Sequence, residues 1–271
     1  MRFINRHPGL GGRLLLALLP LILLALIYGT ASTLRLADNP DDRLLPSLPQ
    51  MADAVVRLGF TEDKRTGEYL LWSDTLASLE RLGLGLSIAS LAGLALGTAA
   101  GVFPLLGASL SPLLAIASMV PPLAILPILF IVFGLDELSK IMLIVIGLTP
   151  VLARDLEQRA REIPQEVLIK AQTLGATSWT LVLRVILPQL LARLLVSLRL
   201  MLGSAWLFLI SAEAISATAG LGYRIFLVRR YMAMDVILPY VVWITLLAWA
   251  MDWGLRRLHR YWFPWSEGGR A

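Results

Sequence analysis

The sequence contains no cysteine, which excludes disulfide bridges and metal sites built on thiolates. It has only two histidines, His7 and His259, and these lie near opposite ends of the chain. A catalytic or metal centre built on histidine is therefore not expected. The sequence also lacks a glycine-rich loop followed by Lys and Ser or Thr, the motif that cradles nucleotide phosphates. The chain is accordingly expected not to be an enzyme and to hold no cofactor or metal of its own.

Charged residues are also scarce. They make up 16% of the chain, whereas 57% of the residues are hydrophobic and the mean hydropathy is +0.74. A soluble domain carries about a quarter charged residues on a surface that must stay hydrated. Because this chain cannot cover itself in that way, its solvent is expected to be largely lipid. The net charge of +5 then fits Lys and Arg held at a cytoplasmic membrane face, and no nucleic-acid partner is expected.

Long runs without charge identify the membrane spans. The first lies between Arg13 and Arg35 and is long enough to cross a hydrocarbon core, which needs about 20 residues. A cleaved signal peptide is the competing interpretation, since Arg2 and Arg6 add to a basic start, but the apolar run is longer than a signal peptide usually has. The sequence predicts an all-α membrane protein with about six transmembrane helices. They lie at 13–34, 77–102, 106–133, 138–156, 190–212 and 235–256.

Two of these spans have features of their own. Glycines within residues 83–101 make one side of the span at 77–102 thin, as close helix packing in lipid favours. The span at 106–133 is expected to be broken near its middle by Pro121 and Pro122, since proline removes a backbone donor from a helix. The sequence thus marks one span for close packing and another for an interruption.

Six spans place both ends of the chain on the same side of the membrane. A small excess of Lys and Arg indicates that this side is the cytoplasm, and the acidic residues lean toward the other side. In the outer loop, residues 47–60 are expected to form a short amphipathic helix on the membrane surface. The chain is then divided into an N-terminal anchor (1–35), an outer, periplasmic loop (36–75), a transmembrane core (76–258) and a cytoplasmic tail (259–271).

A polar segment between the fourth and fifth spans is predicted to form two short helices. Pro164 suits the first turn of a helix, and Glu166 follows at its positive end. Gly175 supplies the stop, and Thr177 or Ser178 can cap a second helix that runs to the fifth span. A short helix with a signal at each end is therefore expected on the cytoplasmic side.

The first of these helices is apolar along one side. Val167, Ala171 and Leu174 recur at helical spacing, with Leu168 beside them. One interpretation is an interfacial helix that rests on lipid headgroups. The other is a docking helix that inserts into a partner protein and transmits force to the two adjoining spans. Periodicity alone favours the interfacial interpretation.

The stretch at 163–188 resembles the signature of binding-protein-dependent ABC importer permeases, an EAA…G segment that forms their coupling helix. Here Glu166 stands for the acid, Lys170 and Ala171 follow it, and Gly175 supplies the glycine. Further blocks match the family in order and spacing, and the resemblance is to permeases for nitrate, taurine and alkanesulfonates. These blocks are VPPLAILPILFIVFGLDELSK at 120–140, SLRLMLGSAWLFLISAE at 197–213 and AGLGYRI at 219–225.

This resemblance implies the transmembrane domain of a type I ABC importer in a bacterial inner membrane. It implies that ATPase subunits, which bind ATP and magnesium, dock on the coupling helix, and that a second, usually identical permease copy completes the pathway. A periplasmic binding protein would deliver the solute and largely set its identity. The sequence departs from the family pattern at 134–137 and at Thr149 and Pro150. The residues that the resemblance assigns to ATPase coupling are Pro164, Glu166, Lys170, Ala171, Leu174 and Gly175.

A second set of residues is a candidate for the gate or the solute pathway. Its members are Pro121, Pro122, Arg199, Ser211, Glu213, Gly220 and Gly222. Arg199 lies inside the fifth span, where a charge needs a partner, and a structural pair with Asp252 is favoured over contact with solute. The small residues at 216–222 fit an outer gate and an ordinary glycine turn equally well. The two prolines fit a packing kink as well as a pathway lined by free backbone groups.

Three other classes of protein compete with the permease interpretation. A pure scaffold subunit agrees with the composition but gives no reason for the capped cytoplasmic helix. An ion-coupled secondary transporter would show inverted repeats and ionisable residues in mid-span, and the sequence shows neither clearly. A membrane-embedded enzyme would need a His or Cys cluster or paired acids within one span, and the sequence has none of these. The permease of an importer for a small oxyanion or sulfonate is therefore the leading expectation.

Overall fold

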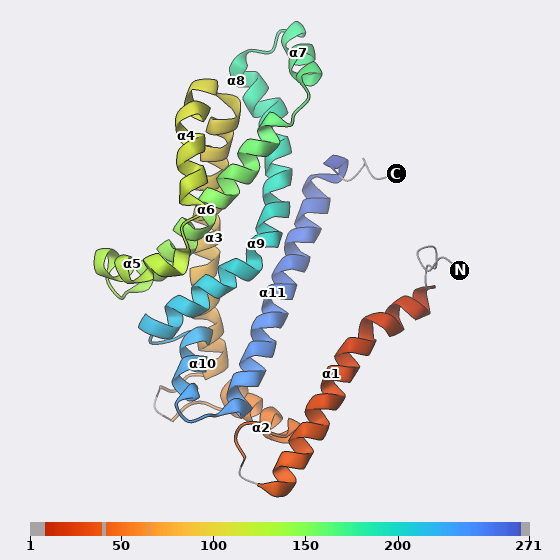
Figure 1. Ribbon diagram of the computed structural model, residues 1–271, viewed down its shortest axis with the longest axis vertical. Helices are drawn as coiled ribbons and strands as arrows, with labels where there is room; N and C mark the ends of the chain where they lie inside the picture. Colours follow the sequence, from red (N-terminus) through yellow and green to blue (C-terminus); the bar gives the residue numbers. More distant parts are fainter. Residues whose placement is uncertain (1–8, 40–41, 65, 267–271) are drawn as a thin grey trace. The chain divides into compact units, whose positions relative to one another are not determined.

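The computed structural model (Figure 1) contains only helices as regular secondary structure within the residues that it describes. These residues are 9–39, 42–64 and 66–266. The prediction of an all-α protein is therefore confirmed, while Arg2, Arg6 and His7 lie outside the described residues. The chain divides into two compact units. They are Met1–Tyr69 with Val228–Tyr240, and Leu70–Leu227 with Val241–Ala271.

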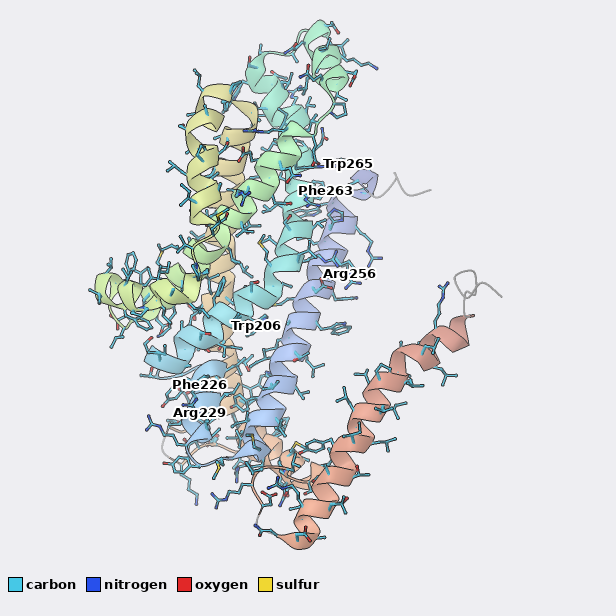
Figure 2. All side chains as sticks on the ribbon, viewed as in Figure 1. Trp206, Phe226, Arg229, Arg256, Phe263 and Trp265 are labelled. Atoms are coloured by element: carbon cyan, nitrogen blue, oxygen red, sulfur yellow. The ribbon has the colours of Figure 1, made fainter. Side chains whose placement is uncertain are left out.

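The first unit contains α1 (Leu10–Asp38), a helix that is long and apolar enough to cross a membrane. It includes the span predicted at 13–34 and extends past both ends of it. Its leucine and isoleucine side chains from Leu14 to Leu34 project outward along the helix (Figure 2) and are exposed, which leaves them to be covered by lipid. The hydroxyl of Tyr28 donates to the carbonyl oxygen of Pro46 at 2.7 Å and so holds the connection that follows the helix.

The same unit contains α2 (Leu48–Phe60), where the sequence predicts a short amphipathic helix. Ser47 and Gln50 form a capping box, in which the backbone N–H of each donates to the side chain of the other. This pair satisfies two backbone donors at the start of the helix. Arg57 of α2 lies 3.7 Å from the carboxylate of Asp235, which belongs to the same unit. The local sequence therefore accounts for this helix and its first residue.

The second unit contains the other helices, except that α10 and α11 each have residues in both units. In chain order these helices are α3 (Leu70–Val102), α4 (Pro104–Ala117), the 3₁₀ turn η2 (Pro122–Ile125), α5 (Leu126–Phe133), α6 (Glu137–Arg161), α7 (Gln165–Thr173), α8 (Ser178–Leu181), the π-helix η3 (Val182–Ile186), α9 (Leu187–Ser216), α10 (Leu221–Arg229), α11 (Met234–Trp262) and η4 (Pro264–Ser266). The elements α8, η3 and α9 form one helical run from Ser178 to Ser216. The second short helix expected after Gly175 is therefore the first part of the fifth span.

The core of the second unit lies where α3 packs against α6. A side chain on Gly93 would lie 2.8 Å from Cβ of Leu152, and one on Gly97 would lie 2.6 Å from the carbonyl oxygen of Ala153. The two helices approach this closely because glycine has no side chain. The expected close packing of this span is confirmed. Gly83 is the exception among its glycines, since nothing lies within 4 Å of a side chain placed there.

The span predicted at 106–133 is broken as expected, but its two parts are not in line. Helix α4 and the pair η2–α5 are bent by 83° at the break. Pro121 has an extended backbone and Pro122 begins η2, because neither proline can donate the hydrogen bond that would continue α4. Helix α5 consequently runs nearly at right angles to α4 (Figure 1).

Among the described residues, four helices are long and apolar enough to cross a membrane, and the bent pair would make a fifth. The remaining span of the six predicted, at 138–156, is most of α6, from its second residue onward. This helix has 25 residues, but it carries charges toward both ends and is not one of the apolar four. Its charged side chains Glu137 and Asp155 pair with Arg81 of α3 and Arg193 of α9, so the charges of α6 are balanced by neighbouring helices.

Candidate functional site

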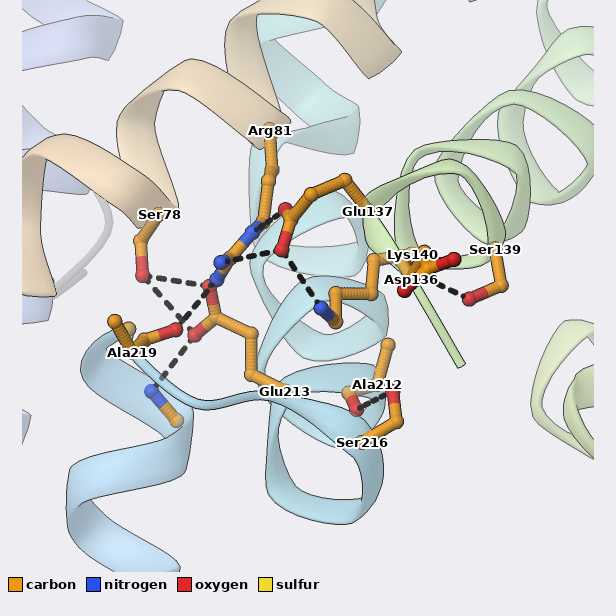
Figure 3. Close-up of polar contacts among 12 residues, drawn as sticks. Ser78, Arg81, Asp136, Glu137, Ser139, Lys140, Ala212, Glu213, Ser216 and Ala219 are labelled. Carbon is orange, nitrogen blue, oxygen red and sulfur yellow. Dashed lines mark hydrogen bonds and ion pairs between the residues drawn. The ribbon is translucent and has the colours of Figure 1, made fainter. Parts of the chain in front are cut away.

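A network of ion pairs and hydrogen bonds joins α3, α6, α9 and α10 inside the second unit (Figure 3). We call it the buried ion network, and its members are Asp74, Ser78, Arg81, Glu137, Lys140, Glu213 and Arg224. Helical spacing places Asp74, Ser78 and Arg81 on one face of α3. Glu137 and Lys140 come from the start of α6, and Glu213 from the last turn of α9. Segments far apart in the sequence therefore meet here.

Arg81 lies at the centre of this network and is almost completely buried. Its Nε and Nη2 atoms donate to the two carboxylate oxygens of Glu137, with an Nη2–Oε1 distance of 2.9 Å. Its Nη1 atom donates to Oε1 of Glu213 at 2.7 Å and to the carbonyl oxygen of Ala219 at 2.8 Å (Figure 3). The planar guanidinium thus holds two carboxylates and a backbone carbonyl at once, which the single ammonium of a lysine would not do in this geometry.

Glu213 has no exposed side-chain surface, so its charge must be balanced inside the protein. Its Oε1 accepts from Arg81, and its Oε2 accepts a 2.8 Å hydrogen bond from the N–H of Gly222. The hydroxyl of Ser78 lies 2.8 and 3.0 Å from the two oxygens. A buried carboxylate with these donors is stabilised as an anion, and removal of Arg81 would leave its charge without a counter-ion.

The turn at 219–222 is fixed to the network through its backbone. Three successive N–H groups donate to the side chains of Asp74, Ser78 and Glu213, at 2.9, 2.9 and 2.8 Å. Gly220 has a φ of +133°, which favours glycine, and a side chain there would lie 2.6 Å from the Glu213 carboxyl carbon. The packing of the network therefore requires the glycine at this turn.

Helices α10 and α11 are also tied to the start of α3. Nε of Arg224 on α10 lies 2.8 Å from Oδ2 of Asp74. The indole N–H of Trp243 on α11 donates to the hydroxyl of Thr75 at 2.9 Å, and its ring meets Trp72 edge to face. These contacts hold three helices together at the end of the unit that carries Arg81.

The short helix α7 lies at the other end of α6 from the buried ion network (Figure 1). Helix α6 has 25 residues, so about 37 Å separates its ends at 1.5 Å per residue. Helix α7 begins after Pro164 and ends just before Gly175, whose φ of +86° is the left-handed conformation that commonly stops a helix. The helix bounds expected from these two residues are confirmed.

No residue of α7 is buried. On the side predicted to be apolar, Val167 is exposed, Ala171 is half-buried, and Leu174, just past the end of the helix, is 81% exposed. Glu166 lies in the first turn and Lys170 in the last, where each charge complements the helix dipole. Because a helix of nine residues is not stable alone, α7 depends on its caps and its two attachments.

The helical run that follows α7 starts with a cap of the predicted kind. Thr177 rather than Ser178 is the capping residue, and its hydroxyl accepts a hydrogen bond from the N–H of Thr180 at 3.2 Å. Trp179 beside it is exposed. The π-helical turn η3 then leads into α9, and such turns often lie at functional sites or hinges. The connection from α7 to α9 thus contains a point where the helix geometry changes.

Helices α6 and α9, which flank α7 in the chain, are joined by a salt bridge that the sequence analysis missed. Nε and Nη2 of Arg193 donate to Oδ2 and Oδ1 of Asp155 at 2.9 and 2.6 Å. The hydroxyl of Ser197 donates to the same carboxylate. The acid and the base are 38 residues apart, and no motif relates them. Asp155 lies near the end of the span predicted at 138–156 and Arg193 near the start of the span predicted at 190–212, and these positions are the one signal that sequence offers.

Arg199 forms the ion pair that the sequence predicts, with its Nε 2.8 Å from Oδ1 of Asp252. Arg256, one turn along α11, contacts the other oxygen of the same carboxylate. The pair links α9 to α11. Ser211, by contrast, donates to the carbonyl oxygen of Leu207 one turn earlier in its own helix and takes no part in the buried ion network.

The structure brings some of the predicted gate residues together and leaves others apart. Glu213, Gly220 and Gly222 meet in the buried ion network. Pro121 and Pro122 lie instead at the break after α4, where Pro122 packs beside Gly147 of α6. No pattern in the sequence predicts Arg81, Glu137 and Lys140 as partners of these residues. The available signal was that Arg81 and Asp136 bound the longest charge-free stretch of the chain.

These features define a class of protein, a helical membrane protein with several spans. A family model described as a binding-protein-dependent transport system inner membrane component matches residues 89–264. The chain belongs to this family, and it is accordingly a permease subunit of an ABC importer rather than an enzyme. The sequence-based expectation of this family is confirmed.

Relatives and solved structures agree with this assignment. The chain is 37% identical over 195 residues to the taurine transport system permease protein TauC of Escherichia coli (strain K12), covering 72% of this chain and 71% of that protein. It is 33% identical over 199 residues to the bicarbonate transport system permease protein CmpB of Synechococcus elongatus, covering 70% and 71%. In fold it is similar to a chain of the inward-facing MetNI methionine ABC transporter, with a TM-score of 0.62, 20% identity, and coverage of 72% of this chain and 96% of that chain.

Proposed function

We propose that this chain forms the solute pathway of an importer in a bacterial inner membrane, with both of its ends in the cytoplasm. The solute is a small anion, a sulfonate or an oxyanion. Separate ATPase subunits bind ATP with magnesium and drive transport, and a periplasmic binding protein delivers the solute. A second copy of the chain completes the pathway.

The observation that carries this proposal is the position of α7. The helix has no buried residue, yet Pro164 and Gly175 define both of its ends. It is attached to α6 on one side and to the continuous run of α8, η3 and α9 on the other. Asp155 and Arg193 tie these two long helices together. A displacement of α7 by a partner would therefore pass into two membrane helices at once.

The charges of α7 favour a protein partner over a lipid surface. A helix that rests on anionic headgroups is typically rich in Lys and Arg on its polar face. Helix α7 carries one acid, Glu166, and one base, Lys170, so it has no net attraction to such a surface. Val167 and Leu174 add exposed apolar area beside these charges. A groove of mixed polarity in an ATPase subunit fits this surface better than headgroups do.

The orientation follows from the same assignment. If α7 meets the ATPase, it lies in the cytoplasm, and the buried ion network at the other end of α6 faces the periplasm. Residues 1–35 then form an anchor, 36–75 a periplasmic segment, 76–258 the permease core and 259–271 a cytoplasmic tail. Glu213, Gly220 and Gly222 consequently belong to the outer end of the pathway, where a gate is required.

The solute class is supported by the names of two relatives. These are permeases of transport systems for taurine and for bicarbonate. Taurine carries a sulfonate group, and bicarbonate is itself an oxyanion, so the two solutes share a small group of anionic oxygens. A solute with the same chemistry is therefore proposed for this chain.

The test is co-purification from membranes, with ATPase activity as the readout. The wild-type chain is expected to retain its ATPase subunits. Gly175→Trp and Glu166→Lys are expected to lose them, or to hydrolyse ATP without transport, because the first fills the end of α7 and the second reverses the charge at its start. Asp53→Lys is the matched control, since Asp53 is exposed on α2, and this variant should retain the ATPase.

A different outcome would contradict the proposal. If the wild-type chain purifies alone and transports solute without any ATPase, an ion-coupled secondary transporter becomes the better account. If Asp53→Lys loses the ATPase as completely as Glu166→Lys does, the docking surface is not α7.

A further inference from the structure

The two acids that bind Arg81 differ in their exposure. The side chain of Glu137 is 57% exposed, whereas that of Glu213 has no exposed surface. Both carboxylates accept hydrogen bonds from the same guanidinium. One acid is thus a permanent part of the protein interior, and the other lies at its edge.

The cations that hold Glu137 are themselves buried. The side chain of Arg81 is 7% exposed and that of Lys140 is 2% exposed. Arg81 presents Nε and Nη2 as a fork, and Nζ of Lys140 donates to Oε1 of Glu137 at 2.9 Å (Figure 3). A carboxylate in this position therefore receives charge-assisted hydrogen bonds from three nitrogen atoms of two buried side chains.

This pattern of burial distinguishes Glu137 from the other acids of the protein. Among the salt bridges of the described residues, those of Glu137 are the ones in which the acid is more exposed than the base. In the pair of Arg199 with Asp252 the two side chains are equally exposed, and in the other pairs, such as Asp155 with Arg193, the acid is the more buried partner. Buried cations with an exposed anion are the arrangement that an anion-binding site needs.

The side chain of Glu137 is 57% exposed on this chain. Because a carboxylate turned toward hydrocarbon is strongly disfavoured, we expect this exposed side to face water. Glu137 is also the first residue of α6, where unpaired backbone N–H groups add positive potential. A water-borne anion can therefore reach the donors that Glu137 now occupies.

We propose that Arg81 and Lys140 form a binding site for the anionic group of the transported solute, and that the carboxylate of Glu137 fills this site when solute is absent. The Glu137 side chain rotates into the water, and a sulfonate or bicarbonate group accepts the hydrogen bonds of Nε, Nη2 and Nζ. Glu213 stays in place as the second partner of Arg81. One anion replaces another, so no buried cation is left without a counter-ion.

This inference rests on the proposed function, because it takes the solute to be an anion that passes the end of the unit opposite to α7. It adds to that function the residues that select the charge of the solute. It also assigns Glu137 a role as an internal competitor, which a purely structural salt bridge would not have.

The test measures anion binding to the full-length chain, purified together with its ATPase subunits where these are retained. Methanesulfonate is the first probe and bicarbonate the second, each titrated at constant ionic strength while the midpoint of thermal unfolding is followed. Glu137→Gln removes the competing carboxylate and should tighten the apparent Kd about tenfold. Lys140→Gln removes one cation and should weaken binding, with an apparent Kd about tenfold higher or more. The variant that combines Glu137→Gln with Lys140→Gln should bind no more tightly than wild type.

Asp136→Asn is the matched control. It removes the same charge one residue earlier, and asparagine is an equally good residue at the start of a helix. Within the described residues, the ion pairs of Arg81 and Lys140 are with Glu137 and Glu213 and not with Asp136. If Asp136→Asn tightened binding as much as Glu137→Gln does, the cause would be a more positive electrostatic potential around the start of α6. The proposed site would then be wrong.

The same experiments distinguish a failure of the anion site from a failure of the proposed importer function. ATP-driven uptake together with an unchanged Kd in Glu137→Gln would overturn the anion site and leave the importer intact. Tighter binding in Glu137→Gln to a chain that purifies without an ATPase would uphold the site and overturn the ATP-driven mechanism. No binding of either probe to wild type or to Glu137→Gln would overturn the site.

Discussion

Arg193 on α9 binds Asp155 on α6 through two parallel hydrogen bonds of 2.9 and 2.6 Å. These helices enter and leave α7, so the salt bridge fixes the distance between the two attachments of the exposed helix. Both side chains are partly exposed, and a pair of this kind contributes only about 1 kcal/mol to stability. Its position therefore suggests a mechanical role more than a stabilising one.

Asp155→Ala is expected to lower the midpoint of thermal unfolding by only a few degrees. Solute uptake per ATP hydrolysed is expected to fall severalfold, because α6 and α9 no longer move together when α7 is displaced. Both rates are measured in the same proteoliposomes. Glu162→Ala is the control, since Gln158 and Arg159, which bind the Glu162 carboxylate, both lie on α6. If uptake and hydrolysis fell in equal proportion, the salt bridge would not act in coupling.

Two glycines with positive φ are expected to respond differently to alanine. At Gly175 a side chain would meet nothing within 4 Å, so Gly175→Ala costs about 1 kcal/mol of backbone strain. At Gly220 a side chain would lie 2.6 Å from Glu213 and 2.7 Å from Arg81, so Gly220→Ala displaces the buried ion network. Membrane levels, measured by immunoblot, should be near normal for Gly175→Ala and strongly reduced for Gly220→Ala. Equal levels would contradict this account of the turn.

Glu213→Ala is expected to destabilise the protein by about 3–5 kcal/mol, because it leaves part of the charge of Arg81 buried without its counter-ion. Glu213→Gln keeps the shape and some hydrogen bonds, so its effect should be smaller. Thermal unfolding in detergent is the measurement. Glu80→Gln removes an exposed carboxylate from the neighbouring position of Arg81 on α3 and should change stability little. Equal losses of stability in Glu213→Gln and Glu80→Gln would show that the burial of Glu213 is not the cause of its effect.

The sequence alone was sufficient for features that depend on local chemistry. Pro164 and Gly175 act on the backbone within one turn of their own positions, and both ends of α7 lie where these residues indicate. The sequence predicts the pair of Arg199 with Asp252, which the structure contains, because an isolated charge inside a span needs a partner and few acids lie within reach. In both cases the physical requirement is met by residues that the sequence makes obvious.

The buried ion network could not be predicted in the same way. Glu137 meets Arg81 only because the chain bends by 83° after α4 and returns so that α6 starts beside α3. Pro121 and Pro122 predict that the helix is broken, but they do not predict the direction in which the chain continues after the break. Arg81 and Glu137 are 56 residues apart, so their pairing depends on tertiary packing, which no local sequence pattern predicts.

For the pair of Arg199 with Asp252, a structural role can be distinguished by experiment from contact with the solute. Its two side chains are exposed to the same extent, which distinguishes it from the exposed acid and buried bases around Glu137. It joins α9 to α11 and lies outside the buried ion network. A charge pair kept for packing should be replaceable by apolar residues of similar volume, and such replacements are often neutral or stabilising.

The variant that combines Arg199→Met with Asp252→Leu is therefore expected to fold and to transport at close to the wild-type rate. Asp252→Leu alone should be less stable by about 2 kcal/mol or more, since Arg199 is then left without its counter-ion in the membrane. Arg256 also loses a partner in both variants, but it is exposed enough to be solvated, so it does not distinguish them. Thermal unfolding and uptake in proteoliposomes are measured for the single and the combined variants. A combined variant that folds as well as wild type but no longer transports would assign Arg199 to the solute pathway, because packing alone would have been restored.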